Sequence, residues 1–391
     1  MTPMKAVVLA AGKGRRLWPL TETRPKPMIP VANQPILEHI LDALESVAVE
    51  EVIFVVGANR ERVQNYFGNG QDRDIEISYV VQEPQLGTGH ALLQAESQIG
   101  NSFIALNGDR IIAPEVIESI WDRQQATQTP TMAVTRVKEP SQYGVVTLEG
   151  RTVTQIHEQP HPDLAESDFI NAGVYAFTPD IFAAIRQTDT HGEQALTDAL
   201  TTYIQDKRLQ AVPYQGRWLD VSEPWDLLTV NAALLAGDEH PPIPETTTIA
   251  ESAVVVDNAR LGDGVGVHPQ AAVLDNVTMG DNVTVGPGAI LENAILLGDV
   301  TIKRGAVVTD CVVGANTTVG PNTTIEGGAT EVVLNDTVYH DVTFGALIGD
   351  NVTMGGNVTI TPGTIVGTDA TLGSGTYVSG HIDDGSHIQR G

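Results

Sequence analysis

Two domains of different fold class are predicted by this sequence: an α/β domain with a mostly parallel sheet, followed by an all-β domain that forms a left-handed parallel β-helix. In the first 236 residues, apolar strands alternate with amphipathic helical segments, which is the pattern of βαβ units. From residue 249 onward, aliphatic residues recur at every sixth position, a period that neither helices nor ordinary strands have. The 391 residues also exceed the ~250–300 at which one hydrophobic core stops growing.

The elements of the first domain, residues 1–236, follow from its apolar runs. Six runs are candidate strands: 5–9, 52–56, 75–81, 103–106, 132–137 and 171–177. Amphipathic stretches between them are candidate helices: 36–46, 61–67 and 88–98. A last helix is expected over 224–236, because a proline stands in its first turn and Gly237 follows its end. The proline-rich stretch 237–248 has no periodicity and predicts a linker.

The second domain, residues 249–391, has a period of six. Nine aliphatic residues keep this spacing without interruption: Ile249, Val255, Leu261, Val267, Val273, Met279, Val285, Leu291 and Leu297. After a phase slip, the spacing resumes in two further runs: Val313, Val319 and Ile325, then Ile348 to Val378. In a parallel β-helix each six-residue rung points one aliphatic side chain inward, and Gly or Asn permits a tight corner with positive φ. The segment 326–347 breaks the register, so we expect it to protrude as a loop.

The composition restricts the classes of function. The chain has 22 Lys and Arg against 49 Asp and Glu, a net charge of −27 that repels nucleic acid. Its one cysteine, Cys311, excludes an intramolecular disulfide and fits a reducing compartment. No apolar run reaches the ~18 residues of a membrane span. We therefore expect a cytoplasmic protein with no membrane or nucleic-acid partner. The scarcity of lysine is typical of a halophilic archaeon, with an ordinary acidic enzyme as the alternative.

One short stretch concentrates positive charge in this acidic chain. Residues 9–27, LAAGKGRRLWPLTETRPKP, contain five cations: Lys13, Arg15, Arg16, Arg24 and Lys26. Gly12 and Gly14 lie among them, directly after the first predicted strand. A glycine-rich backbone at this place in an α/β sheet can point several N–H groups at one anion. The stretch matches neither the Walker loop nor G-x-G-x-x-G, and it predicts an anion-binding site of another kind.

The motif L-A-A-G-K-G-x-R-L followed by R-P-K-P resembles the signature of the sugar-1-phosphate nucleotidylyltransferases. The resemblance covers residues 4 to about 236 and implies a Rossmann-like nucleotidyltransferase domain. With the hexapeptide domain included, the whole chain is similar to archaeal relatives of the bifunctional N-acetylglucosamine-1-phosphate uridylyltransferase/acetyltransferase. The first half is also similar to glucose-1-phosphate thymidylyltransferases. Five separated motifs occur in the order expected for the family.

This resemblance implies roles in nucleotide binding. Arg16 and Lys26 would act in catalysis by holding the triphosphate and the transferred phosphoryl group. The segment V-V-Q-E-P-Q-L-G-T-G-H-A would read the base, because an amide such as that of Gln82 offers a donor and an acceptor to a pyrimidine edge. The nucleotide-binding residues implied are Leu9, Ala10, Ala11, Gly12, Lys13, Gly14, Gln82, Gly87, Thr88 and Gly108.

The same resemblance implies a sugar site and a metal site. The motifs Y-G-V-V, I-H-E-Q-P and I-N-A-G-V-Y match positions that hold the sugar: Gly144, Glu158 and Asn171. Asp109 of L-N-G-D and Asp220 of R-W-L-D match the magnesium ligands. Two carboxylates at strand ends can hold Mg²⁺ against phosphate oxygens. Arg15 stands where the family usually has Thr, and Ser222 where thymidylyltransferases often have Gly. These two departures leave the subfamily undetermined.

The predicted reaction transfers a nucleotidyl group from UTP or dTTP to a sugar 1-phosphate, either glucose-1-phosphate or N-acetylglucosamine-1-phosphate, and releases pyrophosphate with Mg²⁺ as cofactor. The attacking phosphate is already an anion, so catalysis requires positioning and charge neutralisation rather than a general base. Uracil and thymine differ by one methyl group, worth ~0.8 kcal/mol of burial. The sequence therefore leaves the nucleotide and the sugar open.

Two alternatives concern the whole chain. In the first, the β-helix also acetylates glucosamine-1-phosphate from acetyl-CoA, with His340 in the register break as the base. Charge argues against it, because no Lys or Arg lies between Arg304 and Arg390 to hold the phosphates of acetyl-CoA. In the second, the protein is a non-catalytic regulatory subunit, which would have no use for the predicted metal and phosphate ligands. Hexapeptide β-helices usually pack as trimers, so we expect a homotrimer or a multiple of three.

Overall fold

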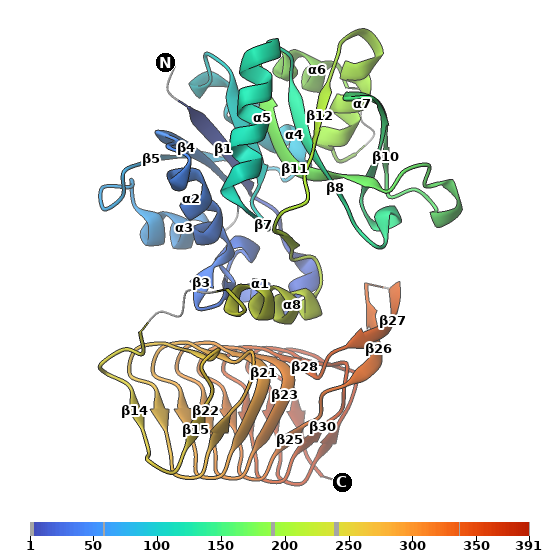
Figure 1. Ribbon diagram of the computed structural model, residues 1–391. Coiled ribbons are helices and arrows are strands. Elements are labelled where there is room, and N and C mark those ends of the chain that lie inside the picture. The colour runs from blue at the N-terminus through green and yellow to red at the C-terminus, as the bar shows by residue number, and fades with distance from the viewer. Residues whose placement is uncertain (1–3, 58, 189–191, 238–241, 336, 391) are drawn as a thin grey trace. The chain divides into compact units, whose positions relative to one another are not determined.

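The computed structural model describes all residues except 1–3, 58, 189–191, 238–241, 336 and 391 (Figure 1). The chain forms two compact units. The first consists of Met1–Lys13, Pro25–Met28 and Ile36–Asp220, and the second of Gly14–Arg24, Ile29–Pro35 and Val221–Gly391. The second unit thus includes two short segments from the N-terminal part of the chain. Residues 238–241 of the predicted linker lie outside the described residues, and the predicted domain boundary stays a proposal.

The first unit is built on a nine-stranded sheet with the order β5-β4-β1-β6-β11-β8-β12-β10-β9. Its strands are β1 (Lys5–Ala10), β4 (Glu51–Val56), β5 (Glu76–Val81), β6 (Phe103–Asn107), β8 (Thr131–Arg136), β9 (Gly144–Glu149), β10 (Thr152–Glu158), β11 (Phe169–Phe177) and β12 (Gln210–Pro213). The strands from β5 to β6 are parallel, as predicted. The other half is mixed: β11 runs antiparallel to β6 and β8, whereas β12 runs parallel to β8. There β9 and β10 form a hairpin, and a tight hairpin can join only antiparallel strands.

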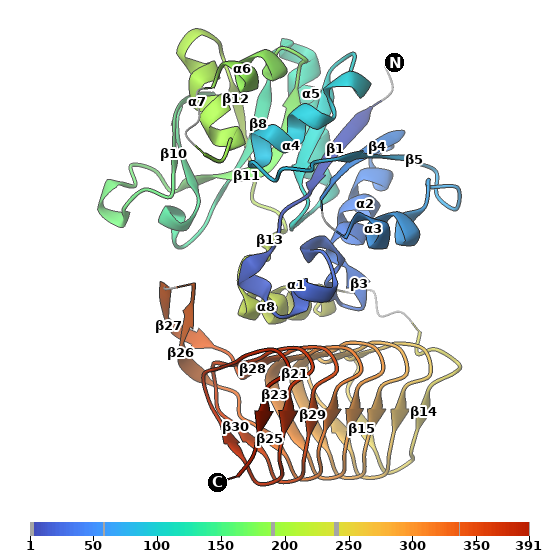
Figure 2. The ribbon, with the colours of Figure 1, turned by 180° about the vertical axis from the view of Figure 1, so that it is seen from behind.

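Helices cover both faces of this sheet (Figures 1 and 2). They are α2 (Ile36–Ser46), α3 (Arg60–Phe67), α4 (Thr88–Gln94), α5 (Pro114–Thr127), α6 (Ile181–Gln187) and α7 (Leu196–Asp206). Apolar side chains of α4, α6 and α7 form one buried cluster with residues of β1 and β4. Helix α5 packs against β8 and β11 and against α2. The predicted bounds of α2 are confirmed, because its apolar residues recur with helical spacing and are buried.

Short elements complete the set. They are the 3₁₀ turns η1 (Arg15–Leu17), η2 (Lys26–Met28), η3 (Glu96–Gln98), η4 (Pro140–Gln142) and η5 (Pro162–Leu164), helices α1 (Leu20–Thr23) and α8 (Pro224–Leu235), and strands β2 (Pro30–Val31), β3 (Gln34–Pro35), β7 (Arg110–Ile112) and β13 (Trp218–Asp220). Strands β7 and β13 pair antiparallel beside the main sheet. In the described part of the chain, no helix has the length and apolar character needed to cross a membrane.

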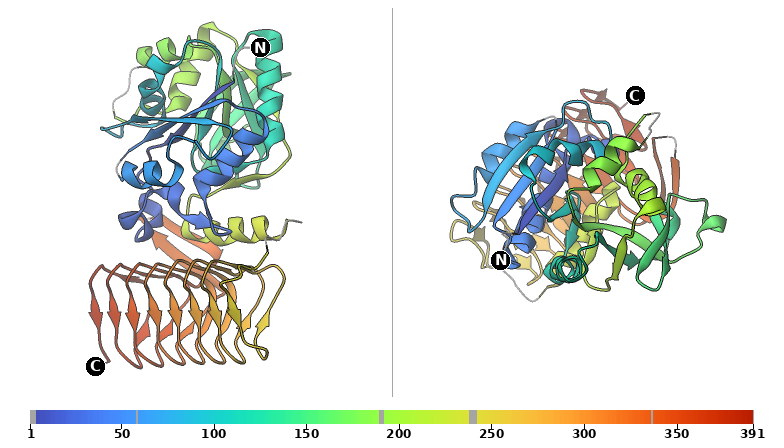
Figure 3. Two further views of the ribbon diagram at one scale, coloured as in Figure 1. Left: turned by 90° about the vertical axis from the view of Figure 1, so that its left-hand side faces the viewer. Right: turned by 90° about the horizontal axis from the view of Figure 1, so that it is seen from above.

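The second unit contains a parallel β-helix, whose stacked coils are seen in Figure 3. Its strands are β14 (Thr248–Ile249), β15 (Val254–Val255), β16 (Arg260–Leu261), β17 (Gly266–Val267), β18 (Ala272–Val273), β19 (Thr278–Met279), β20 (Thr284–Val285), β21 (Ile290–Leu296), β22 (Thr301–Ile302), β23 (Val307–Val313), β24 (Thr318–Val319), β25 (Thr324–Ile325), β28 (Ala346–Ile348), β29 (Thr353–Met354), β30 (Thr359–Ile360), β31 (Thr364–Val366), β32 (Thr371–Leu372), β33 (Tyr377–Val378), β34 (His381–Ile382) and β35 (His387–Ile388). Helix α8 packs against β21 and β23 of this unit.

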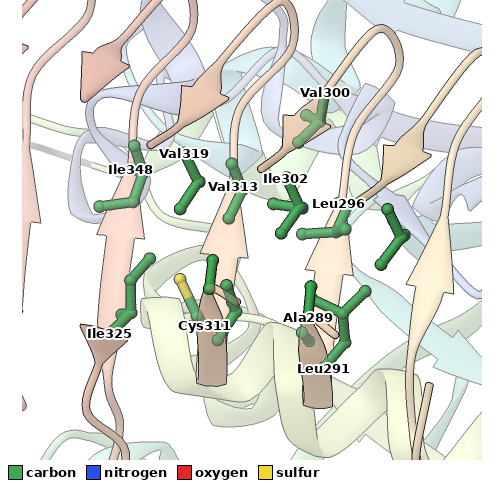
Figure 4. Close-up of a cluster of buried hydrophobic side chains, with 14 of the residues drawn as sticks. Ala289, Leu291, Leu296, Val300, Ile302, Cys311, Val313, Val319, Ile325 and Ile348 are labelled. Atoms are coloured by element: carbon green, nitrogen blue, oxygen red, sulfur yellow. The ribbon is translucent and has the colours of Figure 1, made fainter. Parts of the chain in front are cut away.

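The predicted inward-facing aliphatic residues form one core (Figure 4). Met279 and Leu291 are fully buried in it, whereas Ile249, in the first rung, is 37% exposed. The prediction is wrong at Leu297: Leu296 occupies the core position and pairs with Met279 on one side and Val313 on the other. The phase therefore slips one residue earlier than the spacing indicated.

The corners of the coils contain two kinds of position: residues with positive φ, and glycines that lie close to the next coil. Asn276, Asn282 and Gly288 have φ of 61°, 59° and 68° at six-residue intervals, which confirms the expected positive-φ corners. The glycines directly after the aliphatic residues have a different role. A Cβ on Gly280 would lie 2.8 Å from a backbone atom of the next coil, and one on Gly286 would lie 2.7 Å from another. These glycines are required because adjacent coils approach closely, not because of a left-handed conformation.

The described residues of the segment that breaks the register form two paired strands rather than an irregular loop. Strands β26 (Ala329–Leu334) and β27 (Thr337–Thr343) pair antiparallel and protrude from the coils (Figure 2). At the base of the hairpin, the ring of Phe344 contacts that of Trp225 on α8, as does the ring of Tyr339 on β27. The interruption is therefore packed against the rest of the second unit.

Candidate active site

Lys26 and Asp109 form an ion pair in the first unit. Lys26 begins η2, and Asp109 lies in the turn between β6 and β7. The distance from Lys26 Nζ to Asp109 Oδ2 is 2.6 Å, and the two side chains are 13% and 33% exposed. Burial by itself raises the pKa of Asp109, but the charges of Lys26 and Arg110 outweigh it and hold that pKa below the ordinary value. The carboxylate is therefore ionised at neutral pH.

Arg110, which is not among the predicted site residues, connects Asp109 to Asp220. The β7–β13 register places Asp220 opposite Arg110, the residue after Asp109. Arg110 Nε lies 3.3 Å from Asp220 Oδ1, and its guanidinium lies over the ring of Trp218 at 5.3 Å from the ring centre. Burial lowers the pKa of Arg110, but the two aspartates raise it above its usual value. Two carboxylates and two cations thus form one cluster.

The three predicted sugar-binding residues lie together. Gly144 and Glu158 are register partners in the β9–β10 hairpin. A Cβ on Gly144 would be 2.9 Å from Glu158 Oε2 and 3.6 Å from the Cβ of Asn171. Asn171 is buried, and its side-chain amide donates a hydrogen bond of 2.6 Å to the hydroxyl of Tyr175. Glycine at position 144 leaves the Glu158 carboxylate room that any side chain would fill.

A cavity of about 710 Å³ opens at the ends of β8 and β12 in the same unit. Two aromatic rings, of Tyr143 and Trp218, and two cations, Arg136 and Lys138, contribute to its lining. The three predicted sugar residues do not line it, although Tyr143 directly precedes Gly144.

The glycine-rich stretch is held against its neighbours by backbone contacts. Gly108 donates its N–H to the carbonyl of Leu9 at 2.9 Å, and a Cβ on Gly108 would lie 2.7 Å from that oxygen. Gln85 donates its side-chain amide to the carbonyl of Ala11. Ala10 is buried like Leu9 and Ala11, whereas Gly12 and Lys13 are exposed. Within the described residues Lys13 has no ion-pair partner, so it is available to an anion.

Gln82, the predicted base reader, is 4% exposed. Its amide nitrogen is 3.0 Å from the carbonyl oxygen of Gly87 and 3.0 Å from Nδ1 of His90. Among the described residues its amide oxygen has no partner, which leaves an acceptor for a base N–H. The Thr88 hydroxyl accepts the backbone N–H of Leu196 at 2.9 Å, so Thr88 supports the fold of this region.

Arg16 belongs to the second unit, in the segment that begins at Gly14. Gly14 has φ of 60°, a left-handed conformation that suits glycine and starts η1. Arg16 Nη1 donates to Glu223 Oε1 at 3.0 Å, and the Tyr339 hydroxyl donates to the same oxygen at 3.3 Å. Glu223 caps α8 together with Asp226. Burial and the neighbouring Glu223 raise the pKa of Asp226 to about 7.

The five cations of residues 9–27 have different environments. Arg24 is 5% exposed and forms an ion pair with Asp350, so it cannot bind an anion from solvent. Arg16 and Lys26 are paired with carboxylates that a bound anion would have to replace. Arg15 and Lys13 are exposed.

His340 lies on the hairpin, on β27. Its Nδ1 is 2.6 Å from Glu331 Oε1, and the two side chains are 66% and 68% exposed. Both residues come from the same hairpin, and no Lys or Arg occurs from residue 305 to residue 389. The pair is a surface contact of this hairpin.

Two carboxylates at the edge of an α/β sheet, beside a glycine-rich turn with unpaired positive charge, define an enzyme that handles phosphate groups. The particular family follows from comparison with known proteins. The family described as nucleotidyl transferase matches residues 5–237, and the family described as the GMPPB C-terminal domain matches residues 247–344. The chain belongs to the nucleotidyl transferase family and is an enzyme of that class. The predicted fold class is confirmed, and the second half is consistent with a left-handed β-helix.

Some relatives match almost the whole chain, and others match 60–68% of it. The bifunctional protein GlmU of Methanococcus maripaludis is 34% identical over 99% of this chain and 97% of its own length. The glucose-1-phosphate thymidylyltransferase of Streptomyces antibioticus is 33% identical over 68% of this chain and 74% of its own length. A UDP-glucose pyrophosphorylase solved with UDP-glucose superimposes with a TM-score of 0.55 and 27% identity, over 60% of this chain and 98% of that one.

Proposed function

We propose that the protein transfers a nucleotidyl group from UTP or dTTP to a sugar 1-phosphate and releases pyrophosphate. The observation that carries this proposal is the cluster of Lys26, Asp109, Arg110 and Asp220, together with Gly144, Glu158 and Asn171 in the same unit. The first group supplies charges for a phosphoryl transfer, and the second supplies a carboxylate and an amide for sugar hydroxyls. The thymidylyltransferase and pyrophosphorylase relatives support the substrate class.

The two aspartates fit a magnesium ion. Mg²⁺ prefers hard oxygen ligands and usually takes one or two carboxylates, with water and substrate phosphates completing its shell. In the described part of the chain, no three His, Cys, Asp or Glu side chains are arranged as a complete metal site. Asp109 and Asp220 provide the two carboxylates. When bound, Mg²⁺ would neutralise the charge that develops on the phosphate oxygens.

The chain's own residues then divide the remaining tasks. Lys26, released from Asp109, can pair with the transferred phosphate, and Arg110 can hold Asp220 in place through its hydrogen bond. The free oxygen of Gln82 can accept the N–H of uracil or thymine. Glu158 can accept hydrogen bonds from sugar hydroxyls, which orients the sugar phosphate for in-line attack.

A panel of substrates scored by pyrophosphate release tests the proposal. We expect release with UTP or dTTP only when a sugar 1-phosphate is present, and loss of release when EDTA removes divalent metal. Glucose-1-phosphate, glucosamine-1-phosphate and N-acetylglucosamine-1-phosphate should be compared in parallel, because the residues around Asn171 do not distinguish them. No pyrophosphate with any pair of substrates would refute the proposal.

One observation favours a second activity, acetyl transfer by the β-helix: the chain is similar over its full length to a protein named bifunctional. The charge of the β-helix argues against it. Residues 249–391 contain 16 Asp and Glu but four Lys and Arg, which opposes binding of the phosphates of acetyl-CoA. We therefore propose that the β-helix serves assembly rather than acetyl transfer.

A homotrimer, or a multiple of three, should appear in light scattering at high salt, and a monomer at micromolar concentration would contradict this.

A further inference from the structure

Arg24 and Asp350 form a buried contact between two distant parts of the sequence. Arg24 donates from Nη2 to Asp350 Oδ2, and the two side chains are 6% and 8% exposed. The Thr23 hydroxyl donates to the same oxygen at 2.6 Å. The other carboxylate oxygen accepts the backbone N–H of Ala315 at 2.8 Å. Asp350 thus joins the segment before Lys26 to a corner of the β-helix, within one compact unit.

The chain contains a matched second copy of this corner. The sequence Gly-Asp-Asn-Val-Thr occurs at residues 280–284 and again at 349–353. Asn282 and Asn351 both have φ of 59°. Asp281 accepts a backbone N–H of the preceding coil at 2.9 Å, as Asp350 does at 2.8 Å. The two corners therefore have the same local structure.

The two aspartates differ in what covers them. Asp350 is 5% exposed, because Thr23 and Arg24 lie on it, whereas Asp281 is exposed. Within the described residues, the second carboxylate oxygen of Asp281 has no hydrogen-bond partner. The β-helix requires only the backbone bond for its corner, so the pairing with Arg24 is additional to the repeat.

Further contacts hold the same N-terminal segment on the second unit. The indole of Trp18 stacks on the imidazole of His381 with ring centres 4.5 Å apart and planes inclined by 17°. The buried Asn231 of α8 accepts the N–H of Ala32 at 2.8 Å and the hydroxyl of Thr278 at 3.1 Å. Residues 14–24 and 29–35 therefore pack within the second unit.

We propose that Asp350 is a positioning residue for nucleotidyl transfer: by holding Arg24 and Thr23, it fixes the loop of residues 14–24, which carries Arg16. This inference rests on the proposed function of that loop. Arg24 precedes Lys26 by two residues and follows Arg16 by eight. A loop that must present Arg16 to a triphosphate loses catalytic power when it moves, and a misplacement of about 1 Å can cost about 100-fold. The β-helix would in this way support nucleotidyl transfer without containing an active site of its own.

Asp350→Asn and Asp281→Asn in the full-length protein form the test. Each keeps an oxygen for the backbone N–H of its corner, but only the first removes a charge that faces Arg24. We expect Asp350→Asn to lower kcat about 10- to 100-fold and to raise the KM for the nucleotide. The KM for the sugar phosphate should change less than about twofold, because the predicted sugar residues belong to the other unit. Asp281→Asn should leave all three constants near those of the wild type.

Hydrogen exchange supplies a readout that does not depend on activity. Amides of residues 14–24 should exchange faster in Asp350→Asn than in Asp281→Asn. If Asp350→Asn fails to fold, Thr23→Val is the alternative variant. It removes one hydrogen bond to the same carboxylate but keeps the Arg24–Asp350 ion pair, so no buried charge is left unpaired. It should lower kcat with the same selectivity for the nucleotide.

The outcomes separate the two proposals. Equal kinetic constants in Asp350→Asn and Asp281→Asn, or in Thr23→Val and the wild type, would overturn the positioning role. A wild type that releases no pyrophosphate with any substrate would overturn the proposed function, and with it the catalytic reason for holding the loop. Faster exchange in Asp350→Asn would then still establish that the carboxylate holds the segment.

Discussion

The Asp109 cluster and the His340–Glu331 pair are the two candidate catalytic centres, and they are built differently. The Asp109 cluster draws side chains from η2, the β6–β7 turn, β7 and β13, and its members are partly or largely buried. The His340–Glu331 pair comes from a single hairpin, with both side chains about two-thirds exposed. An exposed ion pair contributes on the order of 0–1 kcal/mol, and solvent screens its charges.

This difference shows where the few Lys and Arg residues of the chain are placed. Lys26 and Arg110 are brought beside carboxylates by segments far apart in sequence, and they keep the pKa of Asp109 low. The hexapeptide domain has four cations, of which Arg260 hydrogen-bonds to a backbone carbonyl of the N-terminal segment. Convergence of several elements on a few charged groups, rather than the presence of a titratable residue, distinguishes a constructed site from a surface pair.

The largest effect is expected from the two aspartates. Asp109→Asn or Asp220→Asn removes a charged ligand from the proposed metal site and should lower turnover by at least about 100-fold. Circular dichroism should show that each variant keeps its fold, because Asn preserves the side-chain shape. Turnover close to the wild-type value in both variants would remove the two residues from the metal site.

The cations of the loop should rank next. Arg16→Ala and Lys26→Ala should each cost roughly 2–4 kcal/mol of transition-state stabilisation, measured as the loss of kcat/KM. Arg15→Ala is the control, because Arg15 is exposed and adjacent to Arg16. A larger loss in Arg15→Ala than in the other two variants would show that the loop presents the neighbouring residue to the phosphates.

Asp109 in the first unit and Asp226 in the second should make contributions of opposite sign to the pH dependence of the free energy of unfolding. The pKa of Asp109 is lower in the folded protein than its ordinary value of 3.8, so its stabilisation is present above that value and is lost as the pH falls through the folded pKa. The pKa of Asp226 is raised from 3.8 to about 7, so its contribution is present below 3.8 and is lost as the pH rises through about 7.

Denaturant unfolding of wild type and variants across pH checks these slopes. Asp226→Asn should remove a fall in unfolding free energy between about pH 4 and 7, and Asp109→Asn should leave that interval unchanged. Identical pH profiles for the wild type and Asp226→Asn would contradict the raised pKa.

The smallest effect is expected at the hairpin. His340→Ala should leave nucleotidyl transfer unchanged, and the wild type should release no thiol from acetyl-CoA with glucosamine-1-phosphate. Salt does not rescue the second reaction, because screening weakens whatever attraction Arg390 provides. Thiol release that disappears in His340→Ala would make the hairpin a second catalytic centre and reverse the comparison.

Much of the fold could be predicted from local pattern. The apolar runs predicted β1, β4, β6 and β8 to within one residue, since buried strands need continuous apolar sequence. The later half of the sheet was not predicted as mixed, because the direction of β11 depends on its neighbours rather than on its own residues. Among the site residues, Asp109 and Asp220 stand in recognisable motifs, but Arg110 has no signal beyond following Asp109.

By itself, the sequence determined the β-helix and most of its inward-facing positions, because a repeat of six encodes a conformation that each coil reproduces against the next. It could not determine which corner has a partner. Asp281 and Asp350 stand in the same five-residue sequence, and only the tertiary structure places Arg24, 326 residues away, on one of them. The same holds for Arg110 and Asp220, 110 residues apart. Local pattern specifies local conformation, whereas the pairing of buried charges depends on how distant segments pack, and no period records that packing.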